Sequence, residues 1–319
     1  MINMKKITLA FSFLIIVSLG FLGPVSSQQR VVRPTMVIDF PSNGPNFQFF
    51  NKIDENDTQS RWRYSLLWNN IIEFSDTNQN GIFDSSSDTV VRNISIQNID
   101  FTYTKVPMNL TGVNDEIVTG SEFIFLGNGT IDNTQFFVTI KIGWWNGVAL
   151  HPYGSNYIKV NQNEAKFSIA LENWTFNSLQ DRLAIMTSIR TTTSLNSYDI
   201  TKYQNGTLSM ITKNNPDGKG KRGGIINNPN VTLIDSDSLK PLNMAVSNTT
   251  NELSIQYSVP FFNHTMLYDP TYSAVATVPI GSDQTTTSSK TSGVPGFDII
   301  SILLLVPTIW LVKKHKKRI

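Results

Sequence analysis

Apolar and polar residues alternate along most of this chain with a period of two, which is the spacing of β-strands and not of helices. The clearest run places a large apolar side chain at every second position, with Trp62, Tyr64, Leu66 and Trp68. Residues 94–103 follow the same period with one slip. Because successive side chains of a strand point to opposite faces, each run predicts a strand that buries one face in a core.

Clusters of turn residues separate these runs. Residues 127–130 have the sequence Gly-Asn-Gly-Thr and lie between aromatic runs at 123–126 and 136–142, which predicts a hairpin. Residues 177–186 are the one candidate for a short helix, and residues 213–229 have the Gly and Pro content of a loop. Further strands are predicted at residues 157–160, 165–171, 184–189, 207–211, 253–259 and 274–280.

Regular short strands with turn signals between them predict an all-β fold, specifically an antiparallel β-sandwich followed by a C-terminal membrane helix. The body is long enough to bury a core of ordinary size. It forms either one large sandwich or two smaller domains, with residues 28–155 in the first and residues 156–280 in the second.

The amino-terminal segment has the layout of a secretory signal peptide. Lys5 and Lys6 precede an apolar run over residues 7–22, and small residues follow as far as Ser27. We expect residues 1–27 to be cleaved as a leader. An uncleaved membrane anchor is the alternative interpretation, and both interpretations export the rest of the chain.

The carboxyl-terminal end has the same parts in reverse order. Residues 281–296 are rich in Ser and Thr and predict an extended stalk. Residues 297–312 predict a membrane helix that is short for a bilayer core of about 30 Å. The basic residues 313–319 stay cytoplasmic by the positive-inside rule, so the body faces outward.

A tripeptide marks the start of this apolar segment, namely Pro295, Gly296 and Phe297. Its position before a short apolar helix and a basic tail resembles the archaeal sorting signals of the Pro-Gly-Phe type. That resemblance implies that a transpeptidase-like membrane enzyme removes the helix and transfers the chain to a lipid. A permanent single-pass anchor is the alternative. Either reading places the protein at the cell surface, attached to the membrane.

The net charge changes sign when the two ends are set aside. The chain has 26 basic and 24 acidic residues, but seven of the basic residues lie in the leader and the tail. The exported part therefore has 19 basic against 24 acidic residues, a net charge of about −5, which gives no support to nucleic-acid binding. Because the chain has no cysteine, it has no disulfide, no thiol nucleophile and no thiolate metal site.

One motif with recognisable chemistry occurs, at residues 76–88. Side chains with oxygen atoms recur at alternate positions, and Gly81 permits the sharp turn of a calcium loop. The stretch resembles the calcium loops of EF-hands, dockerins and thrombospondin type 3 repeats, which implies a structural calcium ion, although Ser87 replaces the glutamate of the EF-hand pattern. A metal-free Asn/Asp/Gly turn is the alternative. The candidate ligands are Asp76, Asn78, Asn80, the backbone carbonyl of Ile82, Asp84 and Asp88.

No other residues form a catalytic pattern in the sequence. Trp144 and Trp145 have the apolar faces that stack on sugars, but burial in the core is the favoured interpretation. The histidines are isolated, at His151, His264 and His315. The acids that a glycosidase would need are scattered, at Asp217, Asp235, Asp237 and Asp269.

These features predict an exported, membrane-anchored surface protein that serves binding, adhesion or envelope structure, with a glycan or a protein as its possible ligand. A surface hydrolase that acts on glycans, with Trp144 and Trp145 in a cleft, is the alternative. Export also makes glycosylation sequons usable. Nine occur, at Asn56, Asn93, Asn109, Asn128, Asn173, Asn205, Asn230, Asn248 and Asn263.

Overall fold

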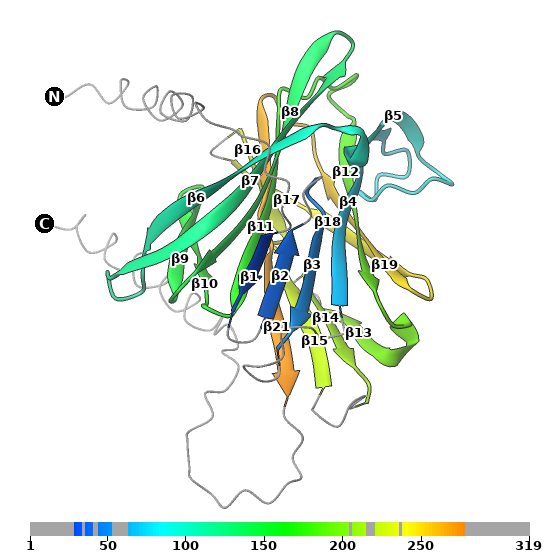
Figure 1. Cartoon of the computed structure of the whole chain (residues 1–319). Helices are drawn as coiled ribbons and strands as arrows, with labels where there is room; N and C mark the ends of the chain where they lie inside the picture. Colours follow the sequence, from blue (N-terminus) through cyan, green and yellow to red (C-terminus); the bar gives the residue numbers. More distant parts are fainter. Residues whose placement is uncertain are drawn as a thin grey trace, which may run out of the picture. The chain divides into compact units, whose positions relative to one another are not determined.

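Antiparallel β-strands make up most of the described chain (Figure 1). The structure, a computed structural model, describes residues 29–33, 36–40, 44–52, 63–203, 206–214, 221–235 and 238–277. The predicted leader, stalk, C-terminal helix and basic tail lie outside these residues, and so does the Pro295-Gly296-Phe297 motif.

The first sheet has eight strands, and its centre is the long strand β4. One edge of β4 pairs with β12, while its other edge pairs with β3 near its start and with β5 near its end. The blue strands β1 to β4 lie beside one another in Figure 1. In spatial order the strands are β1 (Gln29–Val32), β2 (Met36–Phe40), β3 (Phe47–Asn51), β4 (Arg63–Ser75), β12 (Arg182–Thr191), β19 (Glu252–Val259) and β18 (Asn243–Asn248), with β5 (Thr89–Ser95) on β4.

The second sheet has eleven strands and is organised around β11. One edge of β11 pairs with β8, and the other pairs with β21 and then with β20. The path is β13 (Tyr198–Lys202), β14 (Thr207–Thr212), β15 (Lys221–Asn227), β21 (Thr271–Thr277), β11 (Glu164–Glu172), β20 (Thr265–Tyr268), β16 (Val231–Ile234) and β17 (Ser238–Pro241). The remaining strands extend from β11 through β8 (Thr134–Trp145) and β7 (Ile117–Ile131) to β6 (Phe101–Thr111).

Short elements connect the strands of the two large sheets. The hairpin of β9 (Ala149–Tyr153) and β10 (Asn156–Val160) forms a separate two-stranded sheet. Two 3-10 turns occur among the described residues, η2 (Ile96–Asn98) and η3 (Leu195–Ser197). The division predicted at residues 155 and 156 falls within the turn of the β9–β10 hairpin, and the chain on each side of it supplies strands to both large sheets.

Aromatic side chains from the two sheets meet in one hydrophobic core. The ring of Phe40 on β2 lies 4.1 Å from that of Phe123 on β7, and the ring of Phe47 on β3 lies 5.9 Å from that of Phe167 on β11. Each large apolar side chain buried in this way contributes about 1.5–3 kcal/mol. The described residues are therefore all-β with two antiparallel sheets facing one core, which is consistent with a β-sandwich.

The hairpin predicted from residues 127–130 exists, but its turn lies elsewhere. Strand β7 continues through these residues to Ile131, and the turn is made by Asp132 (φ 49°) and Asn133 (φ 65°). Two consecutive positive φ angles fit the type I′ turn that joins tight hairpins. Gly129 is a packing residue instead, because a Cβ there would lie 2.3 Å from the Phe136 ring.

Three other sequence predictions are corrected by the strands. Residues 94–103 are not one strand, since η2 interrupts them where the chain passes from β5 in the first sheet to β6 in the second. Residues 177–186 are not a helix, because β12 begins at Arg182. Residues 213–229 are not only a loop, because they contain β15, where Gly223 lies so close to Met210 that a Cβ would be 2.1 Å from its carbonyl oxygen.

Candidate functional site: a loop and groove, and a buried polar cluster

The loop at residues 76–88 connects β4 to β5, at the right of Figure 1. Asp76 organises its first half, because Oδ1 accepts a hydrogen bond from the Asn80 amide (3.1 Å) and Oδ2 accepts one from the Gly81 amide (2.8 Å). Gln79 and Gly81 both have positive φ angles, of 56° and 74°. The carboxylate therefore sits inside a tight turn of the backbone.

The two asparagines of the motif continue this arrangement. Asn78 Oδ1 also accepts from the Asn80 amide (3.0 Å), so this oxygen and Asp76 Oδ1 face the same N–H group. Asn80 Oδ1 accepts from the Ile82 amide (2.7 Å). Asp76 and Asn78 therefore meet at one backbone amide, while the side chain of Asn80 binds the next turn of the loop.

Asp88 closes the loop. Its Oδ1 accepts from the Thr77 amide (3.1 Å) and its Oδ2 from the Asp84 amide (2.8 Å). The carboxylate of Asp84 accepts instead from the amide and the hydroxyl of Ser86, and these hydrogen bonds lower the pKa of Asp84. The Asp84 carboxylate is therefore held by Ser86, two residues further along the chain.

A hydrophobic contact fixes this loop to the first sheet. The ring of Phe83 lies 5.3 Å from that of Phe74 on β4 and packs on a small buried cluster with Ile72 and Ala184. Arg182 on β12 places Nε 3.9 Å from Asp76 Oδ2. Burial lowers the pKa of this guanidinium, and the charge of Asp76 acts in the opposite direction.

The loop carries oxygen atoms of the type that a hard cation takes. Two carboxylates, two amide oxygens and a main-chain carbonyl are the oxygen ligands that calcium takes. In the ranges that the structure describes, no three His, Cys, Asp or Glu side chains converge in a way that would hold a metal. An ion here would depend on the oxygens of Asn78, Asn80 and Ile82 together with Asp76 and Asp88.

The same loop forms one wall of an open groove of about 500 Å³. Asn243 on β18 ties the groove to the loop, because its Nδ2 donates to the carbonyls of Asn80 (3.4 Å) and Gly81 (3.2 Å). Tyr203 is 50 % exposed. The lining combines amides, one lysine, one phenol and a few apolar side chains, in Asn80, Ile82, Lys202, Tyr203, Gly206, Asn230, Leu242, Asn243 and Met244.

A second group of polar side chains lies between the second sheet and β9. His151 Nε2 is 3.5 Å from Glu122 Oε1, and His151 Nδ1 is 3.6 Å from Asp269 Oδ2. Lys166 Nζ lies 3.1 Å from Asp269 Oδ2, and Ser168 Oγ donates to Asp269 Oδ1 (2.6 Å). The prediction that His151 is isolated and that Asp269 is a scattered acid is therefore wrong, because the fold joins residues far apart in sequence.

Burial keeps external substrates away from the charged groups of this cluster. Lys166 and Asp269 are each 1 % exposed, so an external substrate cannot reach either group. Burial acts to raise the pKa of Glu122, but the hydrogen bond from His151 and the charges of Lys141 and His151 outweigh it and leave the pKa below its usual value. The arrangement can hold charges and transfer protons within the protein, and it does not form a substrate site.

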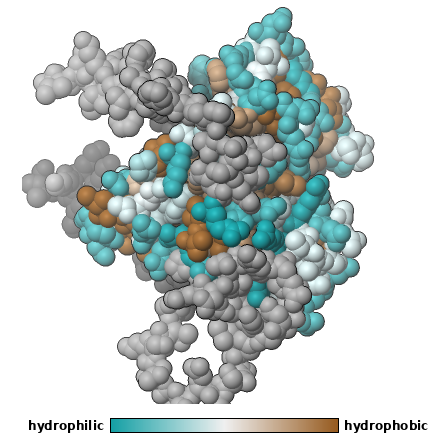
Figure 2. All heavy atoms as spheres, viewed as in Figure 1, coloured by the Kyte–Doolittle hydropathy of each residue, from teal (hydrophilic) through white to brown (hydrophobic). Residues whose placement is uncertain are grey.

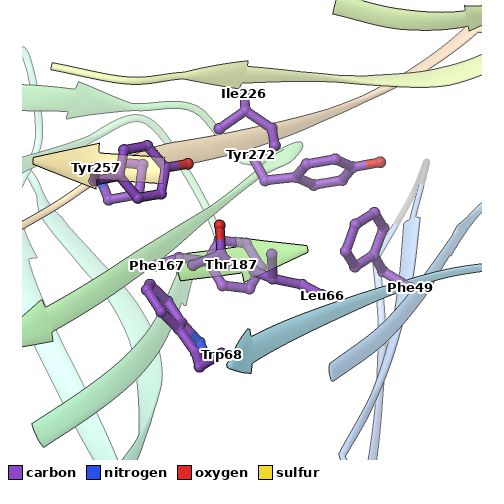
Figure 3. A pocket seen from close by; sticks show the side chains of 9 residues that line it. Phe49, Leu66, Trp68, Phe167, Thr187, Ile226, Tyr257 and Tyr272 are labelled. Carbon is purple, nitrogen blue, oxygen red and sulfur yellow. The ribbon is translucent and has the colours of Figure 1, made fainter. Parts of the chain in front are cut away.

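The aromatic residues proposed for a sugar cleft are in the core. Trp144 and Trp145 are both buried, which agrees with the favoured interpretation of the pair and removes the exposed surface that stacking on a sugar needs. Figure 3 shows another aromatic site, an internal cavity of about 20 Å³ between Trp68, Tyr257 and Tyr272. That volume is enough for about one water molecule and not for a ligand.

The described sequons are all exposed. These are Asn93, Asn109, Asn128, Asn173, Asn230, Asn248 and Asn263, while Asn56 and Asn205 lie outside the described residues.

On the face seen in Figure 2, hydrophobic residues form separate patches among hydrophilic ones, as on a surface in contact with water. Asp235 orders the turn at Asn263, because its carboxylate accepts from the amides of Asn263, His264 and Thr265.

Sequence reasoning reached the loop but not the groove or the buried cluster. The loop has a local signal in the spacing of Asp76 and Asp88, whereas the cluster depends on contacts such as that of Lys166 with Asp269, 103 residues away.

Among the residues that the structure describes, no helix reaches the length and apolarity needed to span a membrane. No known protein family matches this chain, and no curated protein matches it either.

Proposed function

We propose that the protein is an exported cell-surface binding protein whose β-sandwich ectodomain is braced by calcium at the loop of residues 76–88. The proposed ligands are Asp76, Asn78, Asn80, the carbonyl of Ile82, Asp84 and Asp88. Asp84 occupies the position that often acts through water in EF-hand loops, which suits a carboxylate already held by Ser86. Bound calcium would offset the repulsion between the carboxylates and stiffen the loop.

The observation that carries this proposal is that the loop forms a wall of the groove. Asn80 and Ile82 line the groove, and Asn243 donates hydrogen bonds from β18 to the loop backbone. Order in the loop therefore sets the shape of the groove. A structural ion at residues 76–88 would make ligand binding in the groove depend on calcium.

The lining favours a polar ligand, and we propose a glycan. Tyr203 offers an exposed aromatic face on which a sugar ring can stack, and the side chains of Asn243 and Lys202 supply an acceptor and donors for hydroxyl groups. The low density of charge in the groove suits a neutral sugar better than a strongly acidic one. A protein ligand is the alternative.

Attachment to the cell surface is the second part of the proposal. The leader of residues 1–27 directs export, the stalk of residues 281–296 supplies reach, and the end from Pro295 holds the chain at the membrane through its helix or through a lipid. The exposed sequons supply sites for N-glycans on the displayed body.

A glycan array probed with the purified full chain tests this function. We expect binding to at least one glycan in calcium, loss of that binding in chelator, and loss in Tyr203→Ala. Tyr157→Ala is the matched control, because Tyr157 is 68 % exposed on β10, outside the groove. Absence of glycan binding, or binding that survives both chelator and Tyr203→Ala, would contradict the proposal.

A further inference from the structure

The strand pairing of β11 holds a lysine amine against a carboxyl group. Lys166 pairs with Thr271 on β21, and Ile169 pairs with Tyr268 on β20. The connection between these two strands, which contains Asp269, is therefore fixed beside β11, and the Phe167 amide also donates to the Pro270 carbonyl (2.9 Å). Strand pairing on both sides of Asp269 therefore fixes its position beside β11.

The two reacting groups are already in direct contact in the folded chain. Lys166 Nζ is 3.1 Å from Asp269 Oδ2, and the carboxyl carbon is one bond beyond that oxygen. Lys166 Nζ also donates to the Asp269 carbonyl and lies 3.4 Å from Thr271 Oγ1. An amine and a carboxyl group that the fold holds in contact react as an intramolecular pair, with a large gain over free groups in solution.

Burial favours the nucleophilic form of the amine. The side chain of Lys166 is 1 % exposed, and burial lowers its pKa while the charge of Asp269 opposes that shift. A proton transfer within the pair converts the ammonium and the carboxylate into a neutral amine and a carboxylic acid, which are cheaper to bury. The amine then carries the lone pair that attacks a carboxyl carbon.

The neighbours of Asp269 suit the chemistry at its two oxygens. Ser168 Oγ donates to Oδ1 (2.6 Å), so negative charge that develops on Oδ1 has a donor in place. His151 Nδ1 is 3.6 Å from Oδ2 and its Nε2 is 3.5 Å from Glu122, so the imidazole lies between the two carboxyl groups. An imidazole in that position can exchange a proton with Oδ2 while Glu122 holds its other nitrogen.

We propose that Lys166 and Asp269 condense into an intramolecular isopeptide bond. The amine Nζ attacks the carboxyl carbon, and the tetrahedral intermediate holds its charge on Oδ1 beside Ser168. Nζ gives up a proton to the Oδ2 hydroxyl, the carboxyl oxygen that it contacts before the reaction, and Oδ2 leaves as water. One N–C bond forms, one C–O bond breaks, one water molecule is released, and no electrons are transferred to any other group.

This bond would close a covalent ring through the second sheet. It links residues that are 103 apart in the sequence and fixes β11 to the connection between β20 and β21. A chain without cysteine has no disulfide to do this. The low exposure of both side chains also keeps water away from the finished amide.

Mass spectrometry of the purified, denatured full chain tests the proposal. The wild type is expected to be lighter than its unlinked mass by one water molecule, and its digest is expected to contain one branched peptide joining Lys166 to Asp269. Lys166→Met and Asp269→Ala, made in the same host, should each have the full mass and separate peptides. Because the digest of the wild type needs no variant, the test stands even where a variant fails to fold.

Two results would overturn the proposal. One is a wild-type digest in which the peptides with Lys166 and Asp269 are separate, including the case where a succinimide elsewhere explains a missing water. The other is a branched peptide that persists in Lys166→Met, since the link then uses another amine.

Discussion

Replacing Asp76 by alanine removes the carboxylate on which the loop at residues 76–88 depends. Two charge-assisted hydrogen bonds are lost, to the amides of Asn80 and Gly81. Partly exposed bonds of this kind contribute about 1 kcal/mol each, so the unfolding free energy should fall by about 2 kcal/mol even in chelator. The structure thus predicts a loss of stability in Asp76→Ala without the ion as well, because the two hydrogen bonds are lost in either condition.

Calcium should widen the difference between wild type and Asp76→Ala. At a free calcium concentration of about 100 times the dissociation constant, an ion that binds only the folded state adds about 2.7 kcal/mol. For a body of this size each kcal/mol corresponds to a Tm change of about 2–4 °C. We expect Tm to differ by about 4–8 °C in chelator and by about 10–18 °C in saturating calcium.

Thermal unfolding followed by circular dichroism, in calcium and in chelator, measures both differences. Asp199→Ala is the matched control, because Asp199 is an exposed acid on β13 outside the loop. It should keep the full calcium effect. If calcium raised the Tm of Asp76→Ala as much as that of the wild type, the assignment of Asp76 as a ligand would be refuted.

Three further predictions concern pH and processing. The folded pKa of Glu122 lies below 4.5, so its stabilisation is present above about pH 4.5 and lost on further acidification, and Glu122→Gln should flatten the acid limb of a urea-midpoint profile. Burial raises the pKa of Tyr257 above 10.0, so its stabilisation is lost as pH rises past about 10, and Tyr257→Phe should flatten the alkaline limb of the same profile. Changing Pro295, Gly296 and Phe297 to alanine should block removal of the tail in the native host, and intact masses that still lack the tail would contradict a sorting signal.

Local patterns predicted the class of fold and many of its strands. Alternation of apolar residues at Tyr64, Leu66 and Trp68 depends only on the geometry of one strand, and these residues lie in the first half of β4. Trp62 lies outside the described residues. The turn of the β7–β8 hairpin was misplaced because a glycine can mark either a turn or a position where a side chain would clash. Gly127 and Gly129 make room for neighbouring rings, whereas Asp132 and Asn133 form the turn.

Long-range features had no local signal. The change of sheet between β5 and β6 looked like a slip in one strand, because sequence spacing does not tell which sheet a strand joins. Lys166 and Asp269 meet only because β11 pairs with both β20 and β21. The groove likewise needs β13 and β18 to lie next to the loop, which depends on the packing of the whole body.

Titration of calcium into the chelator-stripped full chain, followed by isothermal calorimetry, tests the central claim most directly. A calcium-braced loop predicts one saturable site per chain, lost in Asp76→Ala and retained in Asp199→Ala. A wild-type chain that gives no binding heat and no change in Tm with calcium would show that the loop is held by its own hydrogen bonds, and a site that persists in Asp76→Ala would place the ion elsewhere.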